Sequence, residues 1–293
     1  MKKIGFIGLG IMGEAMAKRL LQNGYELVVY NRTAEKISKL GASNVVPALS
    51  PAEVARNCEI AISMLADSKA VEEIVYGKGG IFESMKPGFI HVDMSTISPI
   101  TTRKLYNDYK ARNAYFIHAP VLGSKSQAAD GTLLIFAGGD RAVIDKCKDI
   151  FIVLGKKVWE FDSVEKATIL KLAMNSMIAT MIVALSQAFV IADKSGVSKE
   201  TVLEILENSA LNSAMYQNKG RTIINGNFEP NFYVKHILKD VNLILESAMD
   251  LKISLPVISV IRELYIQALS KGYENEDYSA IFKVIAELAG VKI

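Results

Sequence analysis

The sequence predicts an α/β fold in which an N-terminal doubly wound parallel sheet precedes a C-terminal all-α domain. Two observations support this prediction. In the first half of the chain, apolar runs of strand length alternate with amphipathic segments of helix length, which is typical of βαβ units. Beyond about Asp162 the strand-like runs stop, and helical periodicity continues to the end. We therefore expect two domains, at residues 1–162 and 163–293.

The individual elements follow from the same periodicity. Strands are expected at Ile4–Ile7, Glu26–Tyr30, Ile60–Met64, Phe89–Asp93, Tyr115–His118, Leu133–Ala137 and Lys157–Phe161. A helical segment, Asp140–Val153, separates the last two strands. In the C-terminal part, glycine and proline predict helix breaks near Gly196, Gly226–Pro230, Pro256 and Gly272.

Composition excludes several classes of function. The net charge of +3 is small and dispersed, and without a lysine or arginine block it argues against a nucleic-acid partner. The two cysteines, Cys58 and Cys147, make no disulfide framework, and no Cys/His cluster has metal-ligand spacing, so no metal is expected. No signal-peptide pattern follows the initial Met-Lys-Lys. We therefore expect a cytoplasmic protein.

One uncharged stretch, Leu172–Ala192, is long enough to cross a bilayer. Polar side chains interrupt it at helical spacing, and lipid would leave them without partners. They are Asn175, Ser176, Thr180, Ser186 and Gln187. We expect a long helix buried between domains or subunits, no membrane partner, and a homodimer or homotetramer.

A G-x-G-x-x-G motif follows the first predicted strand and opens a helix: Gly8-Leu9-Gly10-Ile11-Met12-Gly13. In this context the motif predicts a dinucleotide-binding Rossmann domain. Gly8 permits the tight turn, Gly10 lets the backbone approach the pyrophosphate, and Gly13 lets the helix pack closely on the sheet. The N–H groups of Ile11 and Met12, at the helix start, would face the phosphates.

The second predicted strand ends at Asn31, Arg32 and Thr33. An NAD site would carry an acidic residue here to accept hydrogen bonds from the ribose hydroxyls. The Arg32 guanidinium can instead bind a phosphate with two hydrogen bonds and stack on adenine. An acidic side chain, which would repel a 2′-phosphate, is absent. The pattern therefore predicts NADP(H).

Further segments follow in order: Met64-Leu65-Ala66-Asp67, Asp93–Pro99, Ala119–Lys125, Lys171–Asn175 and Lys239-Asp240. Together with the glycine turn, they resemble motifs of the β-hydroxyacid dehydrogenases. This family includes 3-hydroxyisobutyrate dehydrogenase and the glyoxylate/succinic semialdehyde reductases. The resemblance covers nearly the whole chain. It implies reversible hydride transfer between a nicotinamide and a small aldehyde- or keto-acid, bound in a cleft between the domains.

Several positions are implied to contact the cofactor. Met64 and Leu65 follow one predicted parallel strand, and Ser95 and Thr96 follow the next. They lie at the carboxyl edge of the sheet, where such folds bind ligands, and could hold the nicotinamide ribose. The resemblance implies cofactor contact by Thr96, and by Lys239 from the helical domain. In the alternative interpretation these loops only cap helices.

Lys171 and Asn175 are one helical turn apart and share a helix face. A lysine among apolar residues either extends to water or works in a cleft, and the residues alone leave both open. The resemblance implies that Lys171 is the proton donor or acceptor and that Asn175 orients the substrate. An ammonium group suits this chemistry because it stabilises the oxygen charge that develops during hydride transfer.

Substrate contacts are implied for Gly123, Ser124 and Lys125, which resemble the family's carboxylate-binding loop, and for Phe232 and Asp240. The alternative for Asp240 is a solvated charge pair with its neighbour on a helix. The chain departs from the family pattern in two places. Leu122 stands where the family has Ser, which removes one hydroxyl donor, and Glu165-Lys166-Ala167 replaces a Gly-x-Gly.

Ser124 and Lys125 most resemble the glyoxylate/succinic semialdehyde reductase branch, so reduction of such an aldehyde acid is the first expectation. Oxidation of 3-hydroxyisobutyrate is the second. An imine reductase is a third, although the presence of Lys171 argues against it. A nucleotide-binding scaffold that has lost catalysis also stays open.

Overall fold

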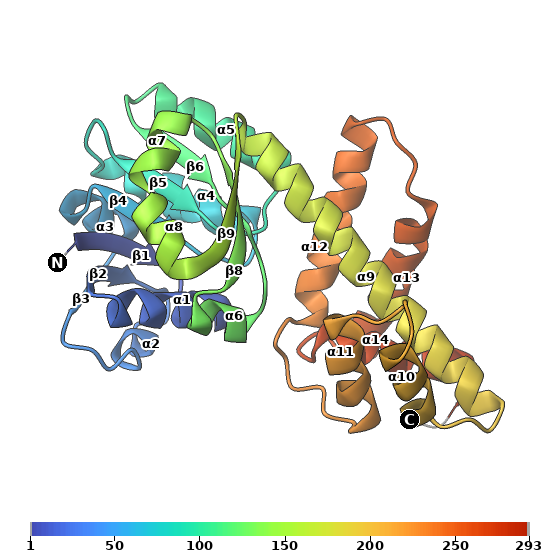
Figure 1. Cartoon of the computed structure of the whole chain (residues 1–293). Coiled ribbons are helices and arrows are strands. Elements are labelled where there is room, and N and C mark those ends of the chain that lie inside the picture. Colours follow the sequence, from blue (N-terminus) through green and yellow to red (C-terminus); the bar gives the residue numbers. More distant parts are fainter. Residues whose placement is uncertain (1, 292–293) are drawn as a thin grey trace. The chain divides into compact units, whose positions relative to one another are not determined.

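The structure is a computed structural model that describes residues 2–291 (Figure 1). Residue contacts divide the chain into two compact units, Met1–Leu172 and Ala173–Ile293. The division falls inside one continuous helix, α9 (Val164–Lys194). The change of periodicity near residue 162 marks where the last strand ends, whereas the contact division marks where the packing partners of α9 change.

The first unit contains a mostly parallel sheet, as predicted. Its strands are β1 (Lys2–Ile7), β2 (Tyr25–Tyr30), β3 (Val45–Pro47), β4 (Ile60–Ser63), β5 (Ile90–Asp93), β6 (Tyr115–His118), β7 (Val121–Leu122), β8 (Leu133–Gly138) and β9 (Gly155–Phe161). They lie in the order β3-β2-β1-β4-β5-β6-β8-β7, with β9 paired to β8. The first six in this order are parallel, whereas β8 runs antiparallel to β6 and β7.

Two strands were not expected from the sequence. β3 has three residues and ends in Pro47, which a sheet accepts at an edge because a proline lacks the N–H of the ladder. β7 has two residues and includes Leu122, which pairs with Leu134. Both are too short to show periodicity, so the sequence signal for them is absent.

Helices of the first unit cover both faces of this sheet (Figure 1). They are α1 (Ile11–Gln22), α2 (Glu35–Ser38), α3 (Pro51–Asn57), α4 (Ser68–Tyr76), η1 (Ile81–Glu83), α5 (Pro99–Lys110), α6 (Lys125–Asp130), α7 (Arg141–Lys146) and α8 (Lys148–Leu154). Neighbouring strand residues enter different cores: Phe6 packs in a cluster with α1 and α8, and Ile7 in one with α3 and α5. This two-sided burial explains why the strands are apolar without alternation. The helix expected at 140–153 is two helices that meet at Cys147.

The described part of the second unit is helical. It contains the rest of α9, then α10 (Lys199–Glu207), α11 (Ala214–Ile224), α12 (Val234–Asp250), α13 (Pro256–Ser270), η2 (Tyr278–Ala280) and α14 (Ile281–Leu288). Every predicted break separates two helices. A further break, at residues 208–213, contains neither glycine nor proline; Ser213 caps the helix that follows it by accepting the Tyr216 N–H.

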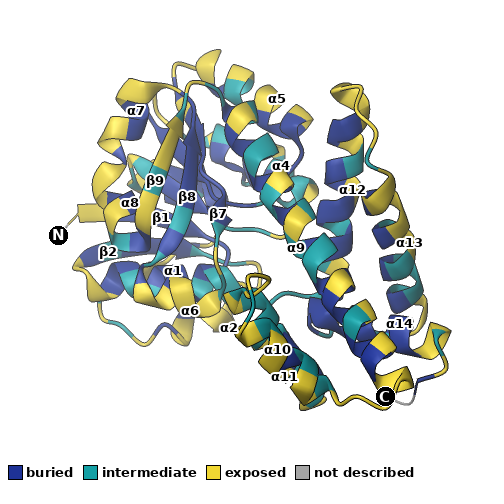
Figure 2. Cartoon of the chain, turned by 45° about the vertical axis from the view of Figure 1, so that its right-hand side comes forward, coloured by how far each residue is buried: buried dark blue, intermediate teal, exposed yellow. Residues whose placement is uncertain are grey.

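Helix α9 is long and apolar enough to cross a bilayer by length and composition alone. In the structure 44% of its most apolar window is buried, and Figure 2 shows the helix banded by buried and exposed residues. The buried positions recur every three or four residues, as on a core helix: Ala179, Ile182, Ser186 and Phe189. The lack of a membrane partner stays a prediction.

Asp277 holds together the loop that precedes α12. Its buried carboxylate accepts hydrogen bonds from Lys219 Nζ at 2.8 and 2.9 Å, from the backbone N–H of Asn231, and from the N–H and hydroxyl of Ser279. A buried carboxylate with this many donors links three segments that are far apart in sequence.

Removal of this carboxylate should destabilise the fold. We expect Asp277→Ala to lower the free energy of unfolding by about 3 kcal/mol, because the Lys219 ammonium and two N–H groups lose a buried partner. Urea denaturation followed by circular dichroism measures the change. Asp145→Ala, which removes an exposed carboxylate paired with Lys148, is the control and should cause little change. Equal effects of the two variants would contradict this role of Asp277.

Two histidines are fully buried in the sheet, His91 on β5 and His118 on β6. Burial lowers the pKa of His91 from 6.5 to about 3 and that of His118 from 6.5 to about 4. Both rings are therefore neutral at pH 7 in the folded protein. The unfolded chain takes up these protons below pH 6.5, whereas the folded chain resists until about pH 4.

Stability should consequently be highest above pH 6.5 and fall as the pH is lowered toward 4. Each histidine contributes a slope of about 1.4 kcal/mol per pH unit in this window. Urea denaturation at a series of pH values measures it. In His91→Gln the slope should be shallower than in the wild type, and an unchanged slope would show that His91 does not stay neutral.

Candidate active site

The glycine turn between β1 and α1 requires glycine at two positions. Gly8 has a φ of +99°, and a Cβ on it would lie 2.5 Å from the carbonyl oxygen of Met64. A Cβ on Gly13 would lie 2.0 Å from the carbonyl oxygen of Gly8. At Gly10 a Cβ would meet no atom within 4 Å, so the backbone there borders open space. The turn is thus packed on its sheet side and open on the other.

The N-terminus of α1 suits a phosphate group. Gly10 is its N-cap residue and no side chain caps it, so the first N–H groups of the helix, among them those of Ile11 and Met12, are available to a ligand. A helix start of this kind attracts anions through its free N–H groups and its dipole. The open space at Gly10 is where a pyrophosphate would approach. The residues present therefore fit a dinucleotide.

Asn31 connects the end of β2 to the turn. Its Oδ1 accepts the Leu9 N–H at 2.8 Å, and its Nδ2 donates to the Thr33 carbonyl oxygen at 2.7 Å. These bonds hold the exposed Arg32 beside the glycine turn. Asn31 therefore acts on the geometry of this loop, in addition to any contact with a ligand.

Lys36, on α2, is a candidate that the sequence interpretation missed. Its Nζ lies 3.3 Å from the Leu9 carbonyl oxygen, so a second cation besides Arg32 borders the turn. The signal was present in the sequence, because a lysine four residues after Arg32 lies in the short helix that follows the β2 tip.

The loops after β4 and β5 are bonded to each other. The Leu65 N–H donates to Ser95 Oγ at 2.9 Å, and Met64 contacts the glycine turn. Thr96 follows and is half-buried. Ser98 accepts the Ile100 N–H and caps α5, so capping explains Ser98 without any ligand. The structure thus places Met64, Leu65 and Thr96 on adjacent loops at the carboxyl edge of the sheet.

The second unit brings three of the predicted residues together. Asn175 Nδ2 donates to Asp240 Oδ2 at 2.6 Å, and Lys239 Nζ forms an ion pair with Asp240 Oδ1 at 2.7 Å. Asp240 is 1% exposed and Asn175 2%, so this is no solvated charge pair. On α9, one turn before Asn175, Lys171 is 8% exposed. A lysine this buried is rare unless it is paired or functional.

In the loop expected to bind the substrate carboxylate, the polar groups of one residue already form hydrogen bonds within the protein. Ser124 caps α6: its N–H donates to Gln127 Oε1 at 2.8 Å, and its hydroxyl donates to the same oxygen. Gly123 has a φ of +145° and is exposed, as is Lys125. The Ser124 hydroxyl hydrogen is therefore already used, and it does not simply replace the hydroxyl that Leu122 lacks.

Phe232 lies in the loop before α12, half-buried, with its ring centroid 5.8 Å from that of Tyr278. Its carbonyl oxygen accepts the Tyr278 N–H at 2.8 Å. Among residues 2–291, no group of three or more His, Cys, Asp or Glu side chains could hold a metal ion. The chemistry of the site therefore comes from lysine, amide, carboxylate and backbone groups.

Comparison with protein families agrees with the two-part architecture. Residues 3–163 match the NAD-binding domain of 6-phosphogluconate dehydrogenase. Residues 166–285 match the NAD-binding domain of NADP-dependent 3-hydroxyisobutyrate dehydrogenase.

Individual relatives span the same region. The chain is 36% identical to glyoxylate/succinic semialdehyde reductase 1 of Arabidopsis thaliana, over 97% of this chain and 98% of the relative. It is 33% identical to the human cytokine-like nuclear factor N-PAC, over 96% of this chain but only 51% of that longer protein. The crystal structure of 3-hydroxyisobutyrate dehydrogenase from Salmonella typhimurium superposes with a TM-score of 0.88 at 25% identity, over 97% of this chain and all of that one. The glycine turn, the fold and these matches show that the chain belongs to the β-hydroxyacid dehydrogenase family and is an oxidoreductase that uses NADP(H).

Proposed function

We propose that this enzyme reduces a small aldehyde acid, such as glyoxylate or succinic semialdehyde, with NADPH, and that Lys171 supplies the proton. The observation that carries the proposal is the buried Lys171, one helical turn before an asparagine whose amide is held by Asp240. The name of the similar Arabidopsis enzyme supports the substrate class.

In this mechanism NADPH, when bound, supplies the hydride that reduces the carbonyl carbon. The protein itself stabilises the carbonyl oxygen of the substrate. Lys171 Nζ donates a hydrogen bond to the carbonyl oxygen and then transfers a proton to it, so that an alcohol leaves. In a buried setting this interaction with the growing negative charge is stronger than in water. In the reverse direction the neutral amine accepts the proton.

Asn175 would orient the substrate. Its bond to Asp240 uses one hydrogen of the amide and fixes the plane of the group, which leaves the carbonyl oxygen and the second N–H for the substrate. Asp240 is balanced by the Lys239 ammonium, so the buried carboxylate does not repel an anionic substrate as strongly as a lone one would. Lys239, which is half-buried, would extend toward the cofactor.

The exposed Lys125 would attract the substrate carboxylate, with Gly123 providing backbone N–H and Phe232 an apolar wall. Leu122 offers no hydroxyl, and the Ser124 hydroxyl is held by Gln127. Carboxylate binding here would therefore depend more on charge than on a hydroxyl donor.

We also propose that the protein is a cytoplasmic homodimer or homotetramer. Large apolar side chains on α13 and just before it are more than half exposed, namely Leu251, Ile253, Val257 and Val260, and contact with a second copy would cover them.

Two other functions have support of their own. Similarity to the Salmonella enzyme favours oxidation of 3-hydroxyisobutyrate as the second candidate. The human relative is named as a nuclear factor and not as an enzyme, and this is the reason to test a non-catalytic nucleotide-binding scaffold as well. A panel of aldehyde acids and hydroxy acids, with NADPH or NADP⁺ absorbance as the readout, separates them. Bound NADPH without turnover on any member of the panel would favour the scaffold.

Substitution of Lys171 tests the mechanism. We expect Lys171→Met to lower kcat about 1000-fold, since a positioned general acid contributes roughly 10²- to 10⁴-fold. The dissociation constant of NADPH should stay within about twofold, because the cofactor loops are unaltered. Lys166→Met, an exposed lysine of the same helix paired with Asp162, is the control and should keep the wild-type kcat. Turnover that survives in Lys171→Met would remove the proposed mechanism.

The cations beside the glycine turn should select NADPH over NADH. We expect Arg32→Asp to raise the dissociation constant of NADPH about 10- to 100-fold, since a hydrogen bond between charged groups contributes about 1.5–3 kcal/mol. Lys36→Met should have the same direction and a smaller size. Fluorescence titration measures both, and NADH binding should not weaken in Arg32→Asp, because an acidic side chain at this position can accept hydrogen bonds from the ribose hydroxyls. Lys39→Met, at the end of α2, is the control. An unaltered NADPH affinity in Arg32→Asp would exclude Arg32 from the 2′-phosphate site.

A further inference from the structure

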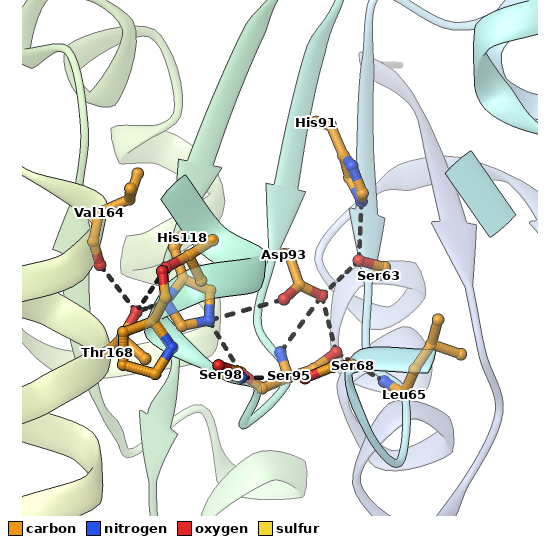
Figure 3. Close-up of polar contacts among 12 residues, drawn as sticks. Ser63, Leu65, Ser68, His91, Asp93, Ser95, Ser98, His118, Val164 and Thr168 are labelled. Atoms are coloured by element: carbon orange, nitrogen blue, oxygen red, sulfur yellow. Dashed lines mark hydrogen bonds and ion pairs between the residues drawn. The ribbon is translucent and has the colours of Figure 1, made fainter. Parts of the chain in front are cut away.

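A network of buried polar side chains lies beneath the cofactor loops of the first unit (Figure 3). All of its members are at most 1% exposed: Ser63, His91, Asp93, Ser95, His118 and Thr168. Burial of polar groups costs free energy unless each is hydrogen-bonded, so a concentration of them in the middle of an apolar sheet calls for an explanation. Among these side chains the sequence motifs gave a role only to Ser95, as a possible contact of the nicotinamide ribose.

Asp93 is the centre of the network. Its Oδ1 accepts the hydroxyl of Ser63 at 2.6 Å and that of Ser95 at 2.7 Å. Ser95 Oγ in turn accepts the Leu65 N–H at 2.9 Å. One carboxylate oxygen therefore connects two loops through hydrogen bonds, the loop after β4 and the loop after β5. Because both hydroxyls converge on one acceptor, the two loops are fixed relative to each other.

His91 is joined to this carboxylate through Ser63. Because Ser63 gives its only hydrogen to Asp93, the His91 Nε2–H must donate to Ser63 Oγ, at 2.8 Å. His91 Nδ1 then accepts the hydroxyl hydrogen of Tyr109 at 2.8 Å. The donors therefore run in one direction, from Tyr109 through His91 and Ser63 to Asp93. Such an ordered chain has a single arrangement of protons.

His118 leads from the same centre to α9. Its Nε2 lies 3.0 Å from the Ser95 carbonyl oxygen and 3.6 Å from Asp93 Oδ2. A carbonyl oxygen only accepts, so the neutral ring carries its proton on Nε2. Nδ1 then has a lone pair and lies 2.7 Å from Thr168 Oγ1, whose single hydroxyl hydrogen is shared between this nitrogen and the Val164 carbonyl oxygen at 2.8 Å. Thr168 is on α9, three residues before Lys171, and thus on the same side of the helix.

We propose that Asp93 is a positioning residue that aligns both halves of the reacting pair. Through Ser63 and Ser95 it orders the loops for the nicotinamide ribose, and through the Ser95 carbonyl oxygen, His118 and Thr168 it orders the turn of α9 that carries Lys171. The second part rests on the proposed role of Lys171. Reaction rates are sensitive to small displacements of reacting groups, so a shared anchor for cofactor and acid has a direct effect on kcat.

The link to α9 is tested by removing one hydroxyl. Thr168→Val keeps the shape of the side chain but loses the bond to His118 and the bond to the Val164 carbonyl oxygen. We expect kcat to fall about 10-fold while the dissociation constant of NADPH stays within about twofold. Thr168→Ser, which retains the hydroxyl, should recover most of the activity. Thr180→Val is the matched control: it removes a threonine hydroxyl from the same helix, where it donates to the Ser176 carbonyl oxygen, and should keep the wild-type kcat.

The link to the loops is tested by Ser95→Ala, which separates Leu65 from Asp93 and leaves the Ser63 bond in place. We expect the dissociation constant of NADPH, measured by fluorescence titration, to rise about 10-fold, together with a fall in melting temperature that reflects the loss of two hydrogen bonds of the buried Ser95 side chain. Asp93→Asn should change both quantities, NADPH affinity and kcat, if it folds. The two single-branch variants test the proposal even when it does not fold.

The results distinguish this inference from the proposed function. If Lys171→Met keeps its turnover, the proposed function fails, while Ser95→Ala still reports on the loops through NADPH binding alone. If Lys171→Met loses turnover but Thr168→Val and Ser95→Ala both behave like Thr180→Val, the function holds and the positioning role of Asp93 is refuted. A purely structural role would lower the melting temperature of Thr168→Val and Ser95→Ala without separating kcat from NADPH affinity, and this result would also refute the inference.

Discussion

Close contact between the backbone of α1 and the turn before it is the constraint from which the cofactor site follows. A side chain at Gly13 would run into the Gly8 carbonyl oxygen, and one at Gly8 would run into the loop after β4. With glycine at both positions, the helix begins directly above the sheet edge, and its first N–H groups are left without a side-chain cap. An anionic ligand can accept hydrogen bonds from these uncapped N–H groups, and these bonds contribute to its binding free energy.

Buried polar side chains of the first unit hold the loops at this edge of the sheet in place. The sheet is apolar on both faces, yet three titratable side chains on β5 and β6 are shielded from water: Asp93 and His118, which end their strands, and His91 within β5. Because Ser63, Ser95 and the rings satisfy one another, the desolvation cost is offset locally and the loops gain a fixed geometry. Apolar contacts at the same place would have no preferred direction, so they would fix the relative positions of the loops less well than hydrogen bonds do.

Local features were predictable from the sequence, and long-range ones were not. The glycine turn, the Arg32 tip and the alternation of strands and helices that indicates a parallel sheet depend on residues close in sequence or on repeated periodicity. Lys36 was missed although its spacing from Arg32 was visible. β7, which contains Leu122, was missed because two residues show no period. The hydrogen bond between Asn175 and Asp240 joins residues 65 positions apart, and no pattern in either segment predicts it.

The sequence by itself determined the fold class, the dinucleotide turn and, by resemblance, the family, because each depends on local propensity or on motifs read along the chain. Only the tertiary structure decided which polar groups are already satisfied. It shows Ser124 used as a helix cap, Asp240 buried against Lys239 and Asn175, and Asp93 at the centre of a network drawn from β4, β5, β6 and α9. The physical reason is that burial and hydrogen bonding depend on which segments meet in space, and that is a property of the packed chain.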